Sequence, residues 1–489
     1  MADLVAGVDV ATADVRVTVA DASGRVRGRG RSPLPPPRQP HPGWSEQDAA
    51  EWWPAVAGAL REATGALGDG ARRIRAVAVA ATSGTVVVVD AEARPLGPAL
   101  LYDDRRAADE GRAAAAAGAD RWEAGGWRPG AGSGVARWAW LLGRPGIVAG
   151  AWRVWHESDL VVHALTGGDP PTDWSHARKS GYDPAAGEWA TEALAAVGIP
   201  QRLVPEVRPP TSPAGCVSQA ASAATGLPAG CDVRLGMTDG CAAQVAAGAD
   251  RPGRFVTVIG TTLVVKGATE DLVRDRAGAV YCHRHPDGWW LPGGASNTGG
   301  AALDGDADPG ALDRAAADHG PAACATYPLV GTGERFPFEA ADATEVWVGE
   351  PRSPTERHRA VLEGVAFAER LAYQRLAGLG AAPDGHVRSA GGGGRSRVWA
   401  AIRATALGRP VLVMDGADTA SGACILAAAG TIHPDLAAAS AAMVGDGEEV
   451  APVDGERDAL DVSFRRLVDR LAERGWVDDD LRPPAAARS

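Results

Sequence analysis

The feature that most constrains the fold of this chain is a pattern of two short strands and a tight turn that occurs twice. Residues 4–10 form an apolar run, which a turn at 11–14 and an alternating segment at 15–20 follow. The pattern returns at 255–266, where a Gly-Thr-Thr turn separates two apolar segments. The two copies lie nearly half the chain apart, which favours an internal duplication; a chance match of two short hairpins is the alternative.

Length and composition favour two globular domains. The chain has 489 residues, which is more than one ordinary hydrophobic core accommodates. Hydrophobic residues make up 45% of the chain and charged residues 22%, as is typical of soluble globular proteins. We predict a first domain over residues 1–249 and a second over 250–489, because the segment 250–253 (Asp-Arg-Pro-Gly) ends a helix of small residues.

Charge and cysteine usage exclude several classes of partner. With a net charge of −12 we expect neither a nucleic acid nor an anionic membrane as a partner, because both require basic surfaces. The longest apolar stretch, 76–89, is interrupted at 82–85 and is too short to span a bilayer. The six cysteines form no CxxC pair, and the N-terminus lacks the pattern of a signal peptide. We therefore expect reduced thiols in a cytoplasmic protein.

Several helices and strands are expected between the turns. Two buried strands are predicted within 77–90, around a turn at 83–85. Helices are predicted at 46–64, with Ser45 as N-cap and Pro54 as a point of kinking, and at 355–376 and 397–407. The segment 301–320 is expected to be a helical insertion, and residues 482–489 a frayed end.

The second turn and a later glycine patch provide groups suited to a nucleoside triphosphate. Gly260, Thr261 and Thr262 offer backbone N–H groups and hydroxyls to phosphate oxygens, although an ordinary hairpin turn has the same pattern. Four glycines at 391–394 allow a backbone to approach a nucleoside ring, and Trp399 behind them is placed to stack on adenine; a flexible loop is the alternative. The only lysines, Lys179 and Lys266, do not follow a glycine loop, which argues against a P-loop fold.

Two aspartates are the candidate acidic groups. Asp239 stands at the expected start of a helix, where the helix dipole favours an ionised carboxylate and hence a general base. Asp9 ends the first strand and is able to hold a magnesium ion through waters. Capping aspartates are the alternative in both places. Taken together, the loops and carboxylates predict ATP-dependent phosphoryl transfer between two related domains.

In this order the segments resemble those of the FGGY family of carbohydrate kinases. The resemblance spans residues 4–435 and implies an α/β, duplicated actin-like (ribonuclease H-like) ATPase fold, with two domains and an interdomain cleft for ATP. Within the family the chain is similar to the plant and cyanobacterial D-ribulose kinases through the strings at 172–183 and 293–300. The other matching segments are Gly43-Trp44-Ser45-Glu46, Tyr102-Asp103-Asp104-Arg105-Arg106, Gly236 to Gly240, Gly260-Thr261-Thr262, Gly333-Glu334-Arg335 and the Gly391 patch.

The resemblance implies a role for each candidate residue. Asp239 would be the catalytic base on the terminal hydroxyl of a ketopentose, D-ribulose before D-xylulose, and Ser83 would contact the sugar, with Asp9 beside it. Mg²⁺ and ATP would be the cofactors, and a sugar and ATP the only partners, in a monomer or a homodimer. The residues implied for ATP are Asp9 and Thr12 at the metal and the transferring phosphate, Gly260, Thr261 and Thr262 at the β- and γ-phosphates, and Gly392, Gly393, Ser396 and Trp399 at the adenosine.

Two departures from the family pattern keep alternatives open. Typical xylulose kinases carry Gln-Met-His-Gly where this chain has the Thr-Ser-Gly-Thr segment 82–85, which disfavours an ordinary xylulose kinase. In the first phosphate loop Ala11 replaces a glycine, Ala13 removes a hydroxyl, and Asp14 adds a charge that either repels ATP or recruits magnesium. A D-xylulose or polyol kinase, a catalytically weak sugar- or nucleotide-binding homologue and an actin-like ATPase acting on proteins are the alternatives.

Overall fold

The computed structural model describes residues 3–303 and 309–482, and these residues form two compact units. The first unit holds residues up to 248 together with 283–288 and 418–444. The second unit holds 249–282, 289–417 and 445 onward. The chain changes unit beside the predicted boundary at 249/250, but the prediction of two consecutive domains did not include the return of 418–444 to the first unit.

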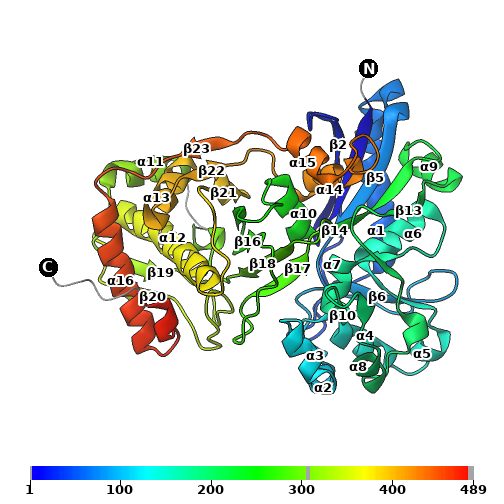
Figure 1. The fold of residues 1–489 in the computed structure, drawn as a ribbon, viewed down its shortest axis with the longest axis horizontal. Helices are drawn as coiled ribbons and strands as arrows, with labels where there is room; N and C mark the ends of the chain where they lie inside the picture. Colours follow the sequence, from blue (N-terminus) through cyan, green and yellow to red (C-terminus); the bar gives the residue numbers. More distant parts are fainter. Residues whose placement is uncertain (1–2, 304–308, 483–489) are drawn as a thin grey trace. The chain divides into compact units, whose positions relative to one another are not determined.

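The first unit contains a six-stranded sheet in the order β13-β14-β5-β1-β2-β3 (Figure 1). Its central strands are almost wholly buried, as expected for apolar runs covered on both faces. The strands are β1 (Leu4–Val10), β2 (Asp14–Asp21), β3 (Val26–Pro33), β5 (Ile74–Ala81), β13 (Pro213–Cys216) and β14 (Asp232–Thr238).

A seven-stranded sheet in the order β17-β18-β16-β15-β21-β22-β23 belongs to the second unit, except that residues 283–284 at the end of β17 fall in the first unit. Its strands are β15 (Phe255–Ile259), β16 (Leu263–Gly267), β17 (Tyr281–Arg284), β18 (Trp290–Ala295), β21 (Val387–Ala390), β22 (Val411–Val413) and β23 (Glu448–Val450).

The two sheets share one pairing pattern, which confirms the duplication. In each sheet an antiparallel hairpin, β1–β2 or β15–β16, begins the pattern. The first hairpin strand then pairs in parallel with β5 or β21, which pairs in parallel with β14 or β22. An antiparallel strand, β13 or β23, follows in each case. Since five pairings agree in order and direction, counting also β2–β3 and β16–β18, a chance match of two hairpins does not explain the repeat.

Helices cover both sheets, and short strands complete the first unit. The helices of the first unit are α1 (Trp52–Gly65), α2 (Ala108–Ala117), α3 (Ala119–Ala124), α4 (Gly134–Leu142), α5 (Ile147–Gly150), α6 (Glu157–Thr166), α7 (Trp174–Ala177), α8 (Thr191–Ala196), α9 (Gln219–Thr225), α10 (Asp239–Ala246), α14 (Thr419–Ala428) and α15 (Leu436–Met443). Its shorter strands are β4 (Glu46–Gln47), β6 (Val86–Val89), β7 (Ala99–Leu100), β8 (Arg153–His156), β9 (Thr172–Asp173), β10 (Tyr182–Asp183), β11 (Glu188–Trp189) and β12 (Val207–Arg208).

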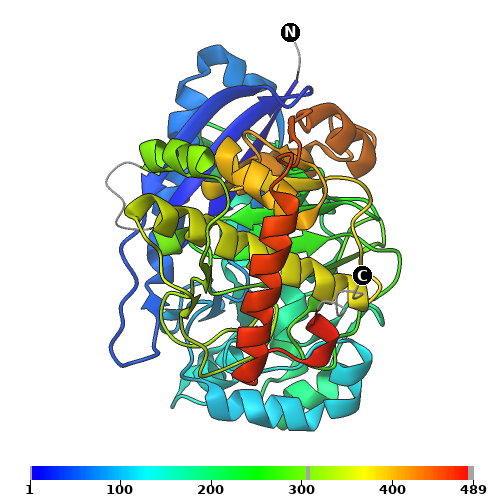
Figure 2. The ribbon, with the colours of Figure 1, turned by 90° about the vertical axis from the view of Figure 1, so that its left-hand side faces the viewer.

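The core of the second unit forms between long helices. They are α11 (Pro309–His319), α12 (Pro354–Gly378), α13 (Arg397–Leu407) and α16 (Arg457–Glu473), beside the small pair β19 (Ala325–Tyr327) and β20 (Val346–Val348). Figure 2 shows α16 as the long red helix in front of α12. The rings of Phe367 on α12 and Phe464 on α16 lie 5.6 Å apart in one buried cluster.

The helix predictions for the second unit are confirmed, but the first is wrong in part. Helices occupy 354–378 and 397–407 as predicted. The predicted helix at 46–64 begins only at Trp52, because residues 46–47 pair with Ala99–Leu100 as strand β4. Pro54 lies in the first turn of α1, where a missing N–H costs no hydrogen bond, so it causes no break.

Two smaller predictions lie partly outside the described residues. Helix α11 falls within the predicted insertion at 301–320, but residues 304–308 of that insertion lie outside the described part. The same is true of residues 483–489 of the predicted frayed end. Among the residues that are described, no helix is both long and apolar enough to cross a membrane.

Candidate active site

Three parallel strands of the first unit end at the same edge of the sheet and bring the predicted catalytic residues together. Strand β5 lies between β1 and β14, with Asp9 opposite Ala80 and Thr238 opposite Ala81. Asp9 is the last residue but one of β1, the 82–85 segment follows β5, and Asp239 follows β14. Residues that the chain separates by some 70 to 230 positions therefore share one edge.

An irregular pairing of β14 with β5 precedes Asp239 and affects its direction. The pairing of β14 with β5 shifts register between Leu235 and Thr238, and such bulges redirect the residues that follow. A Cβ atom at Gly236 would lie 2.0 Å from the carbonyl oxygen of Val79, so only glycine fits there. Asp239 is the first residue of α10, as predicted, and its Oδ1 accepts the Gly240 N–H at 2.8 Å.

Asp9 lies in a buried and strongly charged environment. It is 1% exposed, and its Oδ2 lies 2.5 Å from Nη2 of Arg16, the residue directly opposite on β2. Burial raises the pKa of Asp9 to about 7; Arg16 opposes this shift, and the carboxylates of Asp239 and Asp418 add to it. A cation beside Asp9 would favour the ionised form of this carboxylate.

The altered first phosphate loop is a compact turn whose added charge has partners. The Ala11 N–H donates to the Asp14 carbonyl at 3.0 Å, and Ala11 has no positive φ, so the missing glycine causes no backbone strain. The Asp14 carboxylate accepts from Arg31 Nε at 2.6 Å and lies 3.6 Å from Arg16 Nε. Thr12 is partly exposed, and its carbonyl oxygen accepts from Gln47. The Asp14 charge thus faces two arginines, an arrangement that neither sequence-based alternative included.

The segment between β5 and β6 offers free hydroxyl groups. Ser83 Oγ and Thr85 Oγ1 are buried, and neither has a hydrogen-bond partner among the described residues. Gly84 forms the turn between them with a φ of +91°, which favours glycine. Buried hydroxyls without partners are costly in the absence of a ligand, which is consistent with the predicted sugar contact of Ser83.

Arg137 on α4 holds this segment, and the sequence analysis did not identify it. Its guanidinium donates to the carbonyl oxygens of Gly84 at 2.6 Å, of Tyr102 at 2.5 Å and of Asp104 at 3.1 Å. The side chain is fully buried, and burial lowers the pKa of Arg137 to about 10. Because its partners are backbone carbonyls, no pattern of charges in the sequence indicated it.

In the second unit, the predicted phosphate turn and glycine patch follow neighbouring parallel strands. Val258 of β15 lies opposite Ala390 of β21, so Gly260 and Gly391 leave the sheet at the same edge. A Cβ atom at Gly391 would lie 2.5 Å from the Ile259 carbonyl oxygen, which explains why glycine stands there. The Gly300 N–H donates to the Gly260 carbonyl at 2.8 Å. The string at 293–300 therefore supports the turn at 260–262, where Thr261 is exposed and Thr262 partly exposed.

The predicted adenosine residues divide into open and buried ones. Gly392 has open space around its Cα, whereas a Cβ atom at Gly393 would meet the Trp399 ring at 2.7 Å. Ser396 caps α13, and its Oγ donates to Asp313 at 2.6 Å. Trp399 is 2% exposed and donates its indole N–H to the Leu362 carbonyl at 3.0 Å. The Trp399 ring is thus a core side chain in this structure, with no open face for stacking on adenine.

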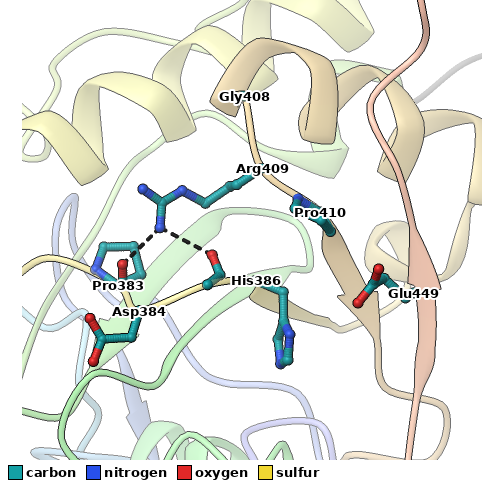
Figure 3. A pocket seen from close by; sticks show the side chains of 8 residues that line it. Pro383, Asp384, His386, Gly408, Arg409, Pro410 and Glu449 are labelled. Atoms are coloured by element: carbon teal, nitrogen blue, oxygen red, sulfur yellow. Dashed lines mark hydrogen bonds between the residues drawn. The ribbon is translucent and has the colours of Figure 1, made fainter.

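A hollow of about 570 Å³ in the second unit lies apart from these residues. Figure 3 shows Arg409 among its lining residues, where Arg409 Nη1 donates to the carbonyl oxygens of Pro383 and Gly385. The hollow adjoins the start of β21, whereas the glycine patch follows the end of that strand. None of the residues predicted for the site lines it.

The first unit offers a divalent metal few protein ligands. Among the described residues no group of three or more His, Cys, Asp or Glu side chains forms a metal cage. Magnesium bound with a nucleotide needs no such cage, since it keeps waters and takes one or two carboxylates besides phosphate oxygens. Asp9 and Asp239 fit this requirement, since the Asp239 charge is near enough to contribute to the raised pKa of Asp9.

The two sheets share one strand arrangement, and each has candidate loops at the ends of its parallel strands. This is the two-domain fold of a sugar kinase of the actin-like ATPase type. Residues 4–246 match the model of the N-terminal domain of the FGGY family of carbohydrate kinases, and residues 255–431 that of the C-terminal domain. The chain belongs to this family, whose members transfer phosphate from ATP to carbohydrates.

The similar proteins include several xylulose kinases. The xylulose kinase of Streptomyces coelicolor is 30% identical over 90% of this chain and 90% of its own length. The xylulose kinase of Streptomyces rubiginosus is 29% identical over 96% of this chain and 98% of its own. A solved xylulose kinase structure from Rhodospirillum rubrum superimposes with a TM-score of 0.85 at 28% identity, over 96% of this chain and 99% of that one.

Proposed function

We propose that the protein phosphorylates the terminal hydroxyl of a ketopentose with ATP, D-ribulose before D-xylulose. The observation that supports this best is the convergence of Asp9, the 82–85 segment and Asp239 at the ends of β1, β5 and β14. It combines a candidate base, free hydroxyl groups for a sugar and a carboxylate for a metal at one edge of a sheet.

The chemistry follows from these positions. Asp239 accepts the proton of the sugar hydroxyl while the hydroxyl oxygen attacks the γ-phosphorus of ATP. A bond forms between that oxygen and phosphorus, the bond to the β–γ bridging oxygen breaks, and ADP leaves. Magnesium, when bound with ATP, neutralises phosphate charge, and Asp9 would hold it through waters. In the second unit, the 260–262 turn and the glycines at 391–393 would bind the nucleotide.

The proposed preference for D-ribulose over D-xylulose rests on the 82–85 segment. Its hydroxyls, on Ser83 and Thr85, stand where typical xylulose kinases carry a different string, and this supports D-ribulose. The xylulose kinases among the similar proteins support D-xylulose as the second candidate. A catalytically weak homologue is the third, since the first phosphate loop differs from the family pattern.

A coupled assay of ADP release tests the proposal with D-ribulose, D-xylulose, L-ribulose, ribitol and glycerol, and with no sugar. We expect ketopentose-dependent turnover that Asp239→Asn lowers at least about 10³-fold, as loss of a general base and its positioned charge would do. The same variant should still bind ATP in calorimetry.

Asp232→Asn is the matched control, because Asp232 begins the strand that precedes Asp239 and its carboxylate accepts from Arg234 at 3.4 Å; this variant should retain turnover. Sugar-dependent turnover in Asp239→Asn would contradict the proposed base. Binding of ATP or a pentulose without turnover in the wild type would favour the weak homologue.

A further inference from the structure

A short buried segment contacts two of the strand ends that form the candidate active site. The segment runs from Asp173, the last residue of β9, through the single turn of α7. Asp173 is 2% exposed, and Ser175 and His176 are fully buried. The string at 172–183 was a marker of resemblance in the sequence, and the proposed mechanism assigns none of its residues a role.

The Asp173 carboxylate organises the segment. Its Oδ1 accepts the Ser175 N–H at 2.8 Å and the Ser175 hydroxyl at 2.5 Å. Its Oδ2 lies 2.5 Å from Nδ1 of His176. One buried carboxylate thereby sets the orientation of both neighbouring side chains.

The first connection leads to β14, the strand that directly precedes Asp239. The N–H of Thr238, the residue directly before Asp239, donates to Ser175 Oγ at 2.9 Å. This bond lies where the β14–β5 pairing is irregular. A side chain thus provides the acceptor for the Thr238 N–H, at the point where the chain turns into α10.

The second connection leads to the strand that carries the 82–85 segment. His176 Nε2 lies 3.4 Å from the carbonyl oxygen of Ala81. The N–H of the same peptide group, that of Thr82, donates to the buried Glu157 Oε2 at 3.1 Å. The peptide group between Ala81 and Thr82 is therefore held from both sides.

His176 faces oxygen acceptors with both ring nitrogens, which the doubly protonated imidazolium satisfies. Burial alone would lower the pKa of His176, but the Asp173 carboxylate and its hydrogen bond outweigh burial and raise this pKa to about 9. Asp159 and Asp239 act in the same direction. The cation thus remains paired with Asp173 while it contacts the Ala81 carbonyl.

We propose that Asp173, Ser175 and His176 are positioning residues that hold Asp239 in register with the 82–85 segment. The proposal rests on the proposed kinase function, because it assigns these residues an effect on the geometry between base and sugar. Their side chains are buried against strand ends that carry the candidate base and sugar segment, so we expect an effect on catalysis and sugar binding rather than on ATP binding.

Ser175→Ala tests the proposal by removing one oxygen atom and the connection to Thr238. Ser180→Ala is the matched control, since Ser180 is equally buried but bonds His156 and neither strand end. We expect Ser175→Ala to lower kcat about tenfold with the KM for ATP within about twofold, and Ser180→Ala to leave kcat within about twofold. Ser175→Thr, which keeps the hydroxyl, should recover most of the loss.

His176→Gln and His156→Gln form a second pair in the same cluster. His156 is also fully buried, but its bonds go to Asp159, Thr172 and Ser180. His176→Gln should lower kcat and raise the KM for the sugar, whereas His156→Gln should change thermal stability alone. The proposal would be overturned if Ser175→Ala and Ser180→Ala changed kcat equally, or if the two histidine variants did so.

Hydrogen exchange without substrates separates this proposal from the proposed function. Ser175→Ala should speed exchange of the Thr238 amide at least about tenfold, and Ser180→Ala should not. Unchanged exchange and unchanged kcat in Ser175→Ala would overturn the positioning role. Absence of ketopentose turnover in the wild type would instead refute the proposed function, whatever the exchange result.

Discussion

At the scale of single residues, the charges around the first hairpin occur in matched pairs. Arg16 lies directly across the hairpin from Asp9, a consequence of strand register. Arg31, on the next strand, pairs with Asp14. The pair of Arg16 with Asp9 is predictable from the sequence, because counting residues outward from a short turn shows which ones lie opposite each other in the hairpin. The second pair required the position of β3, which the turn does not specify.

Arg31→Ala tests whether this pairing makes Asp14 compatible with ATP. In this variant Asp14 retains the longer Arg16 contact at 3.6 Å, so its charge is less well compensated. Such a charge near polyphosphate costs about 1 kcal/mol, and we expect the KM for ATP to rise about fivefold. The double variant Asp14→Asn/Arg31→Ala should return to within about twofold of the wild type, because the charge is then absent. Steady-state kinetics at two salt concentrations measures both, and salt should weaken the effect. A double variant as impaired as Arg31→Ala would mean that Arg31 itself binds phosphate.

At the scale of elements, glycines mark where backbones meet at van der Waals distance. A Cβ atom at Gly7 would lie 2.1 Å from the Ala420 carbonyl, so β1 and α14 pack backbone to backbone. The glycine is visible in the sequence, but the element it contacts is not. The same limitation explains why the helix predicted at 46–64 was given too early a start. Residues 46–47 form a strand because they pair with β7, and this distant partner is not visible in the local sequence.

Gly7→Ala should destabilise the first unit strongly, because the added methyl group overlaps backbone atoms that cannot move independently. We expect a loss of about 1–3 kcal/mol or more, measured as a lower urea midpoint. Gly65→Ala is the control, since it ends α1 with nothing within 4 Å of the added atom. It should be neutral or stabilising by about 0.5–1 kcal/mol. Equal midpoints for the two variants would contradict the close packing of β1 and α14.

At the scale of the whole molecule, residues 418–444 return to the first unit late in the chain. Helix α14 is buried along most of its length and contributes Asp418 to the surroundings of Asp9. The first unit therefore depends on residues that the predicted first domain, 1–249, does not contain. We propose that this domain needs the returning segment in order to fold.

A protein of residues 1–249 should show no cooperative unfolding transition, because removal of α14 leaves the buried face of β1 uncovered. Joining residues 418–444 to it through a flexible linker should restore the transition, as circular dichroism and urea titration would show. The same fusion with a scrambled 418–444 sequence is the control. Cooperative unfolding of residues 1–249 alone would show that the predicted domain folds independently.

The sequence by itself determined the class of fold and most of the candidate site. Turns and alternating strands are local patterns, so the two hairpins, Asp9, Asp239 and the glycine patch were identifiable from spacing, and their order carried the family resemblance. The tertiary structure alone decided which distant groups meet: Arg137 with the 82–85 segment, Ser175 and His176 with two strand ends, α14 with β1, and Trp399 with the core. Those contacts depend on long-range packing and backbone carbonyls, which leave no periodic signal in the chain.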